Sequence, residues 1–387
     1  MDLISLLPEL LKGLSNFTLG NVVMLAVGAI LIYLAIAKEY EPVLLLPIGF
    51  GCILANIPLS GMTATEGATV ASGMTPVMGV MSVLYKAGIS TELFPLLIFV
   101  GVGAMIDFSP LLAQPRMVLL GAAGQFGIFG TLILAILLGF PLNQAASIGV
   151  IGAIDGPTSI FVATKLAPEL LAPIAVAAYS YMSLIPIIQP PLMRLLTTKK
   201  ERMIRMDYAP KPISQRTLVI FPIALTIVVG LLVPEATPLI SMLMLGNLLK
   251  VSGVVERLSK AAENEIINIA TLFLGLVVGA TMTAEAFLNW DTGKIMLLGL
   301  LAFALDTVAG LLFGKLMSFL SGGKINPLIG AAGISAFPMA GRLAARMAQE
   351  EDFDNFILMH AMGANTAGQL GSVMAGGILL AIVSKLV

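Results

Sequence analysis

Residues 147–163 read SIGVIGAIDGPTSIFVA and place one acidic side chain, Asp155, in a run with no other charge between Leu142 and Lys165. A carboxylate at the centre of a bilayer costs roughly 2.5 to 3.5 kcal/mol, so such a residue indicates a functional site. The next two residues are Gly and Pro, and proline breaks a helix because it lacks an amide hydrogen. The stretch therefore predicts a broken helix at membrane depth, which persists only inside protein or beside a cavity. A structural role for Asp155 as a helix cap is the alternative.

The composition around this stretch is that of a membrane protein. Hydrophobic residues make up 58% and charged residues 11% of the 387 residues, whereas a soluble domain carries about 25% charged residues. A net charge of −1 excludes nucleic-acid binding as the main function, and the hydrophobicity excludes intrinsic disorder. The single cysteine, Cys52, excludes a disulfide within the chain. Long apolar runs without alternation favour helices over a β-barrel, so we expect an all-α polytopic membrane protein.

The hydrophobic segments are twelve in number and follow an N-terminal stretch of different character. Residues 1–18 lack a cationic start, which argues against a signal peptide, and their leucines recur at helical spacing, which predicts an interfacial amphipathic helix. The expected membrane segments are residues 19–37, 42–58, 93–108, 117–140, 144–165, 168–190, 214–234, 236–250, 266–287, 294–320, 325–345 and 356–385.

A basic loop divides these segments into two halves. Residues 194–216 hold seven basic side chains against Glu201 and Asp207, which predicts that this loop is cytoplasmic. The expected organisation is therefore a first membrane repeat over 19–193, the cytoplasmic loop, and a second membrane repeat over 217–387.

The two halves share ordered landmarks. PIGFGCILANIP in the first half corresponds to SMLMLGNLLKVSG in the second, and each precedes a Gly-Ala pair, at Gly103 and Gly279. The sequence GAIDGP then begins 49 residues after Gly103, and GAAGIS begins 51 residues after Gly279. Three landmarks in the same order suggest a duplicated unit of six elements.

The fifth element of each half, around Asp155 and around Ser335, is interrupted by Gly, Pro and polar residues. If each is re-entrant, each half crosses the membrane five times and the halves insert in opposite orientations. Two inverted-topology repeats with broken or re-entrant helices meeting at the midplane form a transporter plan with an ion site between the repeats. The charges agree with cytoplasmic placement of Lys38, Arg116, Lys250, Arg257, Lys260, Lys324, Arg342 and Arg346.

The second fifth element supplies neutral ligands and one cation. It contains Asn326, Gly330, Ser335 and Arg342 and no acid. The spacing of seven residues would place Ser335 and Arg342 on one face if the segment were helical. Na⁺ prefers oxygen ligands, and Arg binds carboxylates through two hydrogen bonds. Arg342 as a positive-inside anchor is the alternative.

Tyr181 is a further candidate, because a tyrosine hydroxyl can ligate a cation or carry a proton, although tyrosines at the membrane interface are commoner. His360 is the only histidine. The sequence contains no zinc-type Cys/His cluster and no phosphate-binding loop, so metal catalysis and ATP hydrolysis are not expected.

Four motifs in order carry a resemblance to a known family: GAIDGPT, APELLAPIAVAAYSYM, GNLLKVSGVVERLS and NPLIGAAGISAFPMAGR. With them the chain, from about Gly20 to the C-terminus, resembles the β subunit of the biotin-dependent sodium-pumping decarboxylases. That group includes the oxaloacetate, methylmalonyl-CoA, glutaconyl-CoA and malonate enzymes.

The resemblance implies that the subunit decarboxylates carboxybiotin, brought by a separate biotinyl carrier, and exports Na⁺ while consuming a proton. Its partners would be carboxyltransferase and biotin carrier subunits and a small membrane-anchored linker subunit, with a trimer of this chain in the cytoplasmic (inner) membrane. The family's functional pattern falls on Asp155, Tyr181, Asn326, Gly330, Ser335 and Arg342 without a departure.

The residues and the resemblance predict one mechanism. Asp155 would bind Na⁺ with Asn326, Gly330, Ser335 and nearby carbonyls. Arg342 would hold the carboxylate of carboxybiotin from the cytoplasmic side, and Tyr181 or Ser335 would pass the proton. The alternative is a secondary transporter, a Na⁺/H⁺ antiporter or a Na⁺-coupled carboxylate symporter, which the same inverted repeats would serve.

Overall fold

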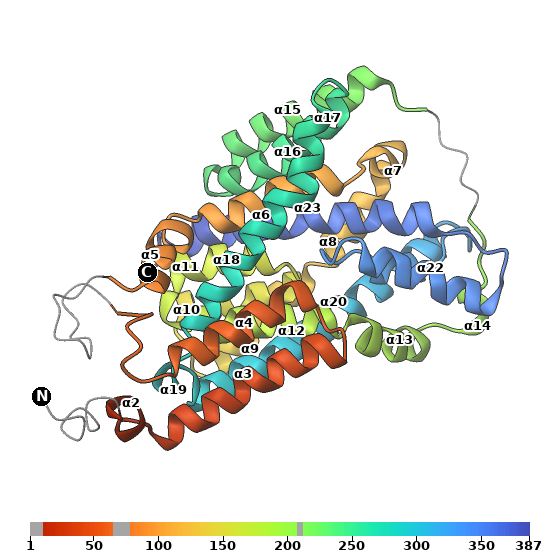
Figure 1. Ribbon diagram of the computed structural model, residues 1–387. Helices are drawn as coiled ribbons and strands as arrows, with labels where there is room; N and C mark the ends of the chain where they lie inside the picture. The colour runs from red at the N-terminus through yellow and green to blue at the C-terminus, as the bar shows by residue number, and fades with distance from the viewer. Residues whose placement is uncertain (1–10, 65–77, 207–211) are drawn as a thin grey trace, which may run out of the picture.

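The computed structural model describes residues 11–64, 78–206 and 212–387, and this part of the chain is helical with no strand (Figure 1). The first ten residues of the expected interfacial helix and part of the central loop lie outside it. The only described helix before residue 19 is α2 (Lys12–Ser15), and Leu11 before it and Leu14 within it are exposed. The interfacial helix over 1–18 therefore stays a prediction.

Twelve of the described helices between residues 19 and 202 belong to the first half of the chain, six before residue 124 and six after it. The first set comprises α3 (Leu19–Ala37), α4 (Pro42–Ala55), α5 (Val80–Leu84), α6 (Leu93–Met105), α7 (Ser109–Ala113) and α8 (Val118–Ala123). The second set comprises α9 (Phe126–Leu137), α10 (Leu142–Gly149), α11 (Gly156–Leu166), α12 (Leu171–Ser183), α13 (Ile185–Leu196) and α14 (Lys199–Arg202).

The second half contains fewer and longer helices. They are α15 (Gln215–Leu232), α16 (Thr237–Ser252), α17 (Glu256–Ala261), α18 (Ile267–Ala280), α19 (Ala284–Phe287), α20 (Trp290–Leu320), α21 (Leu328–Ala331), α22 (Met339–Glu351) and α23 (Leu358–Val383).

Fewer of the described helices have the length and composition of a complete membrane span than the number of crossings that the sequence predicted. Six described helices are long and apolar enough to span a bilayer, or eight if two bent pairs each count as one span. The sequence predicted ten crossings. The difference has a physical cause, since glycine and proline divide several expected segments into helices too short to span. The pair formed by α12 and α13, for example, bends by 64° at Leu184.

Six helices pack in a row in which helices of the two halves alternate at the centre, from α4 to α16. Along this row α3 contacts α4, α4 contacts α18, α18 contacts α6, α6 contacts α16, and α16 contacts α15. Figure 1 shows α3 and α4 on one side and α15 and α16 on the other, with α6 and α18 between them.

Glycines and buried amides hold the inner contacts of this row. A Cβ on Gly279 or on Gly103 would collide with the backbone of the facing helix, so only glycine permits these approaches. Asn56, after α4, donates to the Met282 carbonyl at 2.7 Å, and Asn247 of α16 donates to the Ile106 carbonyl at 3.0 Å. The contact between α4 and α18 thus uses the same device as the contact between α16 and α6.

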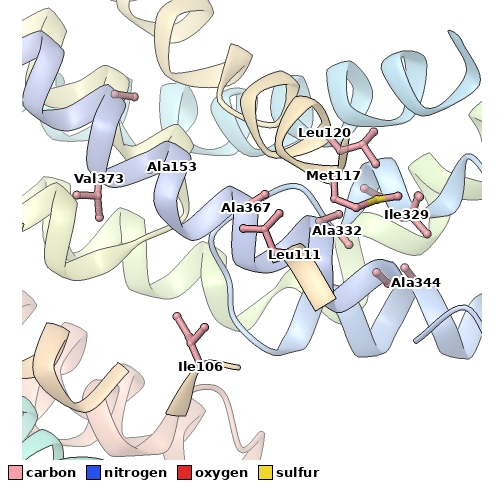
Figure 2. Close-up of a cluster of buried hydrophobic side chains, with 14 of the residues drawn as sticks. Ile106, Leu111, Met117, Leu120, Ala153, Ile329, Ala332, Ala344, Ala367 and Val373 are labelled. Atoms are coloured by element: carbon pink, nitrogen blue, oxygen red, sulfur yellow. The ribbon is translucent and has the colours of Figure 1, made fainter. Parts of the chain in front are cut away.

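Helices α8 to α13, α21 and α22 pack against α20, α23 or both, and this group contains both interrupted segments. Figure 2 shows Ala367 and Val373 of α23 in the same buried cluster as Ala153 and Ala332. Ala153 lies two residues before Asp155, and Ala332 lies three residues before Ser335. The small side chains let α23 approach the backbone of both segments closely.

Candidate functional site

Asp155 lies at a break in the fifth segment, as the sequence predicted. Helix α10 ends in a short 3₁₀ turn over Val150–Ala153, and Ile154 then adopts φ +55°, a left-handed conformation that β-branched residues rarely take. Asp155 is the N-cap of α11, and one of its oxygens accepts the Thr158 amide at 3.5 Å. The cap geometry that the sequence offered as the alternative is therefore present.

The carboxylate of Asp155 also meets three side chains that a cap does not require. Its Oδ2 accepts hydrogen bonds from Thr158 Oγ1 at 2.7 Å, Gln369 Nε2 at 2.7 Å and Ser372 Oγ at 3.0 Å. Gln369 and Ser372 come from α23, more than 200 residues further along the chain. Asp155 is 6% exposed and forms no ion pair with a basic side chain of the described residues. The protein thus gathers hydroxyl and amide groups, and no cation of its own, around this charge.

The break around Ser335 meets the same stretch of α23. Ser335 lies between α21 and α22, is buried, and donates to the Gly368 carbonyl at 3.0 Å. Asn365 donates to the Ile334 carbonyl at 2.6 Å. Gly368 is the neighbour of Gln369, which binds Asp155. One turn of α23 therefore connects the two breaks.

Several oxygens beside the second break have no hydrogen-bond partner among the described residues. The buried amide oxygens of Asn365 and Gln125 are two of them, and the Thr366 hydroxyl is a third. Gln125 itself, in the break between α8 and α9, donates to the Gly368 carbonyl at 3.2 Å. Buried polar atoms normally have partners, so a group of free acceptors marks a place where a cation or water fits.

Asn326 and Gly330 lie at contacts of a different kind. Asn326 donates to the carbonyls of Arg202 and Ile204, both at 2.9 Å, and its own oxygen accepts the Leu328 amide at 3.0 Å. Its side chain thus anchors the central loop, and none of its hydrogen bonds reaches Asp155 or Ser335. Gly330 faces Gly310 of α20, where a Cβ would collide with backbone.

The two tyrosines of α12 lie differently. The Tyr181 hydroxyl donates to the Met296 carbonyl of α20 at 2.5 Å. The Tyr179 ring packs on Gly156, the residue after Asp155, and leaves no room for a Cβ there. The buried Tyr179 hydroxyl has no hydrogen-bond partner among the described residues. Of these two tyrosines, Tyr179 therefore contacts the Asp155 break, whereas the predicted Tyr181 binds the backbone of α20.

Arg342 is exposed on the first turn of α22 and forms no ion pair within the described part of the chain. The segment between Ser335 and α22 is not helical, so the shared helical face that the spacing suggested does not exist.

The described part of the basic loop is fastened to the end of α22. Arg202 pairs with Glu351 at 2.6 Å, and Arg205 pairs with Asp352 at 2.6 Å. Hydrogen bonds from these guanidinium groups hold the pKa values of Glu351 and Asp352 below their ordinary values. The loop that separates the two halves thus also joins them.

The sequence analysis did not identify Gln369, Ser372 and Asn365. Their signal was available, because they recur at intervals of four and three residues in the last apolar segment and so share one helix face. A polar stripe on a membrane helix faces protein, as it does here.

Comparison with known proteins places the whole chain in one family. Residues 20–383 match the family described as the Na⁺-transporting oxaloacetate decarboxylase beta subunit. The methylmalonyl-CoA decarboxylase subunit beta of Veillonella parvula is 54% identical over 97% of this chain and 96% of its own length. The glutaconyl-CoA decarboxylase subunit beta of Acidaminococcus fermentans is 53% identical over 96% of both chains. The oxaloacetate decarboxylase beta chain of Haemophilus ducreyi is 47% identical over 97% of this chain and 98% of its own length.

Proposed function

This chain belongs to the family of Na⁺-transporting decarboxylase beta subunits, and on that premise we propose that it decarboxylates carboxybiotin delivered by a separate biotinyl carrier subunit. It is a multi-pass membrane protein and the membrane subunit of a decarboxylase coupled to sodium transport. The transporter alternative is set aside, because the matched family is one of decarboxylases. The acyl substrate of the whole complex is left open, since relatives with three different substrates are 47% to 54% identical.

The Na⁺ site of this proposal is the Asp155 break. The observation that carries it is the convergence of Thr158, Gln369 and Ser372 on one oxygen of a buried, unpaired carboxylate. A hard monovalent cation takes oxygen ligands, and these three side chains each carry one. When Na⁺ arrives, the two hydroxyls need only rotate, and the Gln369 amide needs only turn its oxygen inward.

The second break supplies neutral ligands and the route for the substrate. Ser335 and the side-chain oxygens of Asn365 and Gln125 that have no described partner can complete the coordination shell of Na⁺ or bind the ion during transfer. Arg342, exposed and with no ion pair to a described residue, would bind the carboxylate of carboxybiotin at the cytoplasmic entrance. Asn326 and Gly330 would act by positioning the second break, through the loop and through α20.

Decarboxylation breaks the bond between the carboxyl carbon and the ureido nitrogen. The electron pair stays on the nitrogen, which takes a proton as CO₂ leaves, and a site with little water favours the loss. We assign the proton delivery to the Ser335 hydroxyl in preference to Tyr181. Ser335 binds the carbonyl of Gly368, and the next residue of α23, Gln369, binds Asp155. Na⁺ and H⁺ would compete for the Asp155 oxygens, which would tie proton entry to Na⁺ release.

The two halves are proposed to be inverted repeats, with boundaries at 19–193 and 217–387 and a cytoplasmic loop over 194–216. Two matched contacts support this. Asn56 and Asn247 occupy corresponding landmarks in the two halves, and each binds a carbonyl just beyond a helix of the other half. Labelling of a cysteine placed at Lys200 tests the orientation, since reaction with a reagent restricted to the outer side would contradict it.

The partners belong to the same proposal. They are a carboxyltransferase subunit, a biotin carrier subunit and a small membrane-anchored linker subunit, with three copies of this chain in the cytoplasmic (inner) membrane. Copurification of this chain with a biotinylated protein on avidin resin is the expected result, with biotin-blocked resin as the control.

The decisive experiment for the activity uses the full chain in detergent or vesicles with free carboxybiotin. Stimulation of CO₂ release by Na⁺ but not by K⁺ is expected. CO₂ release that is indifferent to Na⁺, or no release from folded protein, would contradict the proposal.

A further inference from the structure

A second carboxyl group, that of Asp306, is buried at the middle of a membrane helix. Asp306 is 0% exposed and lies sixteen residues after the start of α20 and fourteen before its end. At a rise of about 1.5 Å per residue, both ends of α20 are more than about 20 Å away. The carboxyl therefore lies near the centre of the bilayer, where an ionisable residue indicates function.

The contacts of Asp306 are far fewer than those of Asp155. Its Oδ1 accepts a hydrogen bond from the Gly127 amide, which lies in the first turn of α9 and has no partner within its own helix. Its Oδ2 is buried and has no hydrogen-bond partner among the described residues. A Cβ at position 127 would lie 2.5 Å from the Ala302 carbonyl and would also meet the carboxyl. The approach of α9 to Asp306 thus requires glycine.

No cation of the described residues neutralises this carboxyl. The elements packed against α20 include α8, α9, α10, the 3₁₀ turn before Asp155, α12, α13 and α21. Their titratable or charged side chains are Tyr179, Tyr181 and Arg194, with Asp155 just after the 3₁₀ turn. Arg194 is exposed and pairs with Glu350 at 3.0 Å.

Lys294 and Lys315 are the basic side chains of α20 itself. Lys294, near its start, pairs with Asp291 at 2.9 Å. Lys315 pairs with Glu201 at 3.2 Å and donates to the Leu196 carbonyl at 3.0 Å. Both ammonium groups are therefore held at other partners, and Asp306 is left without a counter-charge.

We propose that Asp306 binds a proton and forms a second cation site of the pump, separate from the Na⁺ site at Asp155. A buried carboxylate with one donor and one orphaned oxygen retains most of its desolvation cost, and a bound proton removes the charge. No group of hydroxyl and amide side chains converges on Asp306 as it does on Asp155, so the site suits H⁺ better than Na⁺. Only the O–H bond of the carboxyl forms or breaks in this step.

The site has a short structural connection to the Na⁺ site. Gln125, two residues before Gly127, donates to the Gly368 carbonyl, and the next residue, Gln369, binds Asp155. Loss of the proton from Asp306 would strengthen the hydrogen bond that its carboxylate accepts from the Gly127 amide. The stronger bond would draw the first turn of α9 toward Asp306. This assignment rests on the proposed function, in which decarboxylation consumes one proton and moves Na⁺.

The test is infrared spectroscopy of the full chain in lipid vesicles at neutral pH, with aspartate labelled at the side-chain carboxyl carbon. Exposed aspartates are ionised at this pH. Saturating Na⁺ discharges any proton from Asp155, so a protonated-carboxyl band that moves on labelling and persists in saturating Na⁺ is expected from Asp306. This band should disappear in Asp306→Asn and remain in Asp155→Asn.

Three outcomes would overturn the proposal: no such band in the wild type, a band unchanged in Asp306→Asn, or a band removed by Na⁺, which would make Asp306 a Na⁺ ligand. If Asp306→Asn does not fold, the Na⁺ titration of the wild-type band still decides. A folded Asp306→Asn chain should lose about 100-fold in coupled decarboxylation, within the range for proton-transfer groups, while its Na⁺ affinity is kept. The spectrum is independent of turnover, so failure of Na⁺-stimulated decarboxylation would count against the proposed function and not against this site.

Discussion

The break at Asp155 and the break at Ser335 occupy corresponding places in the two halves of the chain, yet their chemistry is opposite. The first holds a carboxylate surrounded by donors. The second holds no acid, and several oxygens beside it have no partner among the described residues. Both meet α23 within residues 365–372. The difference fits the proposed function, in which neither break is a complete site: one would supply the charge and the other neutral ligands and the entrance.

The largest effect on the difference between the two breaks is expected from a substitution at Asp155. Replacing Asp155 by Asn should abolish Na⁺-dependent decarboxylation, a loss of about 100-fold or more, because an amide neither offsets Na⁺ nor takes a proton. Asparagine caps helices as well as aspartate does, so the chain should still fold. Decarboxylation rates against Na⁺ in vesicles measure the effect. Retention of wild-type Na⁺ dependence would reduce Asp155 to a helix cap.

The next largest effect is expected from a substitution on the α23 side of the first break. Gln369→Leu removes the amide oxygen that would turn toward Na⁺ in the proposed site, and a contact of this kind with a charged group is worth about 1.5 to 3 kcal/mol. The Na⁺ concentration for half-maximal rate should therefore rise roughly 10- to 100-fold. Gln144→Leu, at a half-buried glutamine of α10 that binds Glu169, is the matched control. Equal Na⁺ curves for the two variants would remove α23 from the ion site.

Arg342 tests the entrance of the second break. Arg342→Lys keeps the charge but loses the paired geometry for a carboxylate, so turnover at low carboxybiotin should fall about tenfold while Na⁺ affinity stays. Arg346→Lys is the control, since Arg346 lies one turn further along α22 and pairs with Glu350. A shift of the Na⁺ curve alone would assign Arg342 to the ion pathway.

A substitution at Ser335 should give a smaller change, and this change should appear in the dependence of the rate on Na⁺ and not on carboxybiotin. Ser335→Ala removes a neutral ligand and one hydrogen bond to Gly368, worth about 1 kcal/mol. The Na⁺ concentration for half-maximal rate should rise several-fold, with Ser384→Ala at the end of α23 as the control. An unchanged Na⁺ curve with a slower proton-dependent step would make Ser335 a proton donor only.

The ion pairs between the loop and α22 have the smallest expected effect, because they lie at the end of α22 and the Arg205 side chain is 58% exposed. The pKa of Asp352 is lowered below 3.8 and that of Glu351 below 4.5 in the folded chain, through Arg205 and Arg202. Their stabilisation is complete above these values and is lost as pH falls through the lowered pKa values. Proteolysis of the loop should therefore quicken in acid. Asp352→Asn should quicken it at neutral pH, and loop cleavage unaffected by this variant would show that the pairs do not hold the loop.

The fold class and the interruption at Asp155 could be predicted from sequence, because charge scarcity and a Gly-Pro pair in an apolar run leave few alternatives. The partners of Asp155 could not, since Gln369 and Ser372 are distant in sequence and only packing of α23 brings them near. Asn326 shows the reverse difficulty, because an amide suited to an ion site binds loop carbonyls instead. The lengths of the individual helices could not be predicted either, because hydropathy does not report where glycine and proline end a helix.

The most direct test of the account is equilibrium binding of radioactive Na⁺ to the full chain in detergent, without substrate, compared among the wild type, Asp155→Asn, Gln369→Leu and Ser384→Ala. The account predicts saturable binding by the wild type and Ser384→Ala, weakened binding by Gln369→Leu, and none by Asp155→Asn. Undiminished saturable binding by folded Asp155→Asn would contradict it, because the cation would then reside elsewhere.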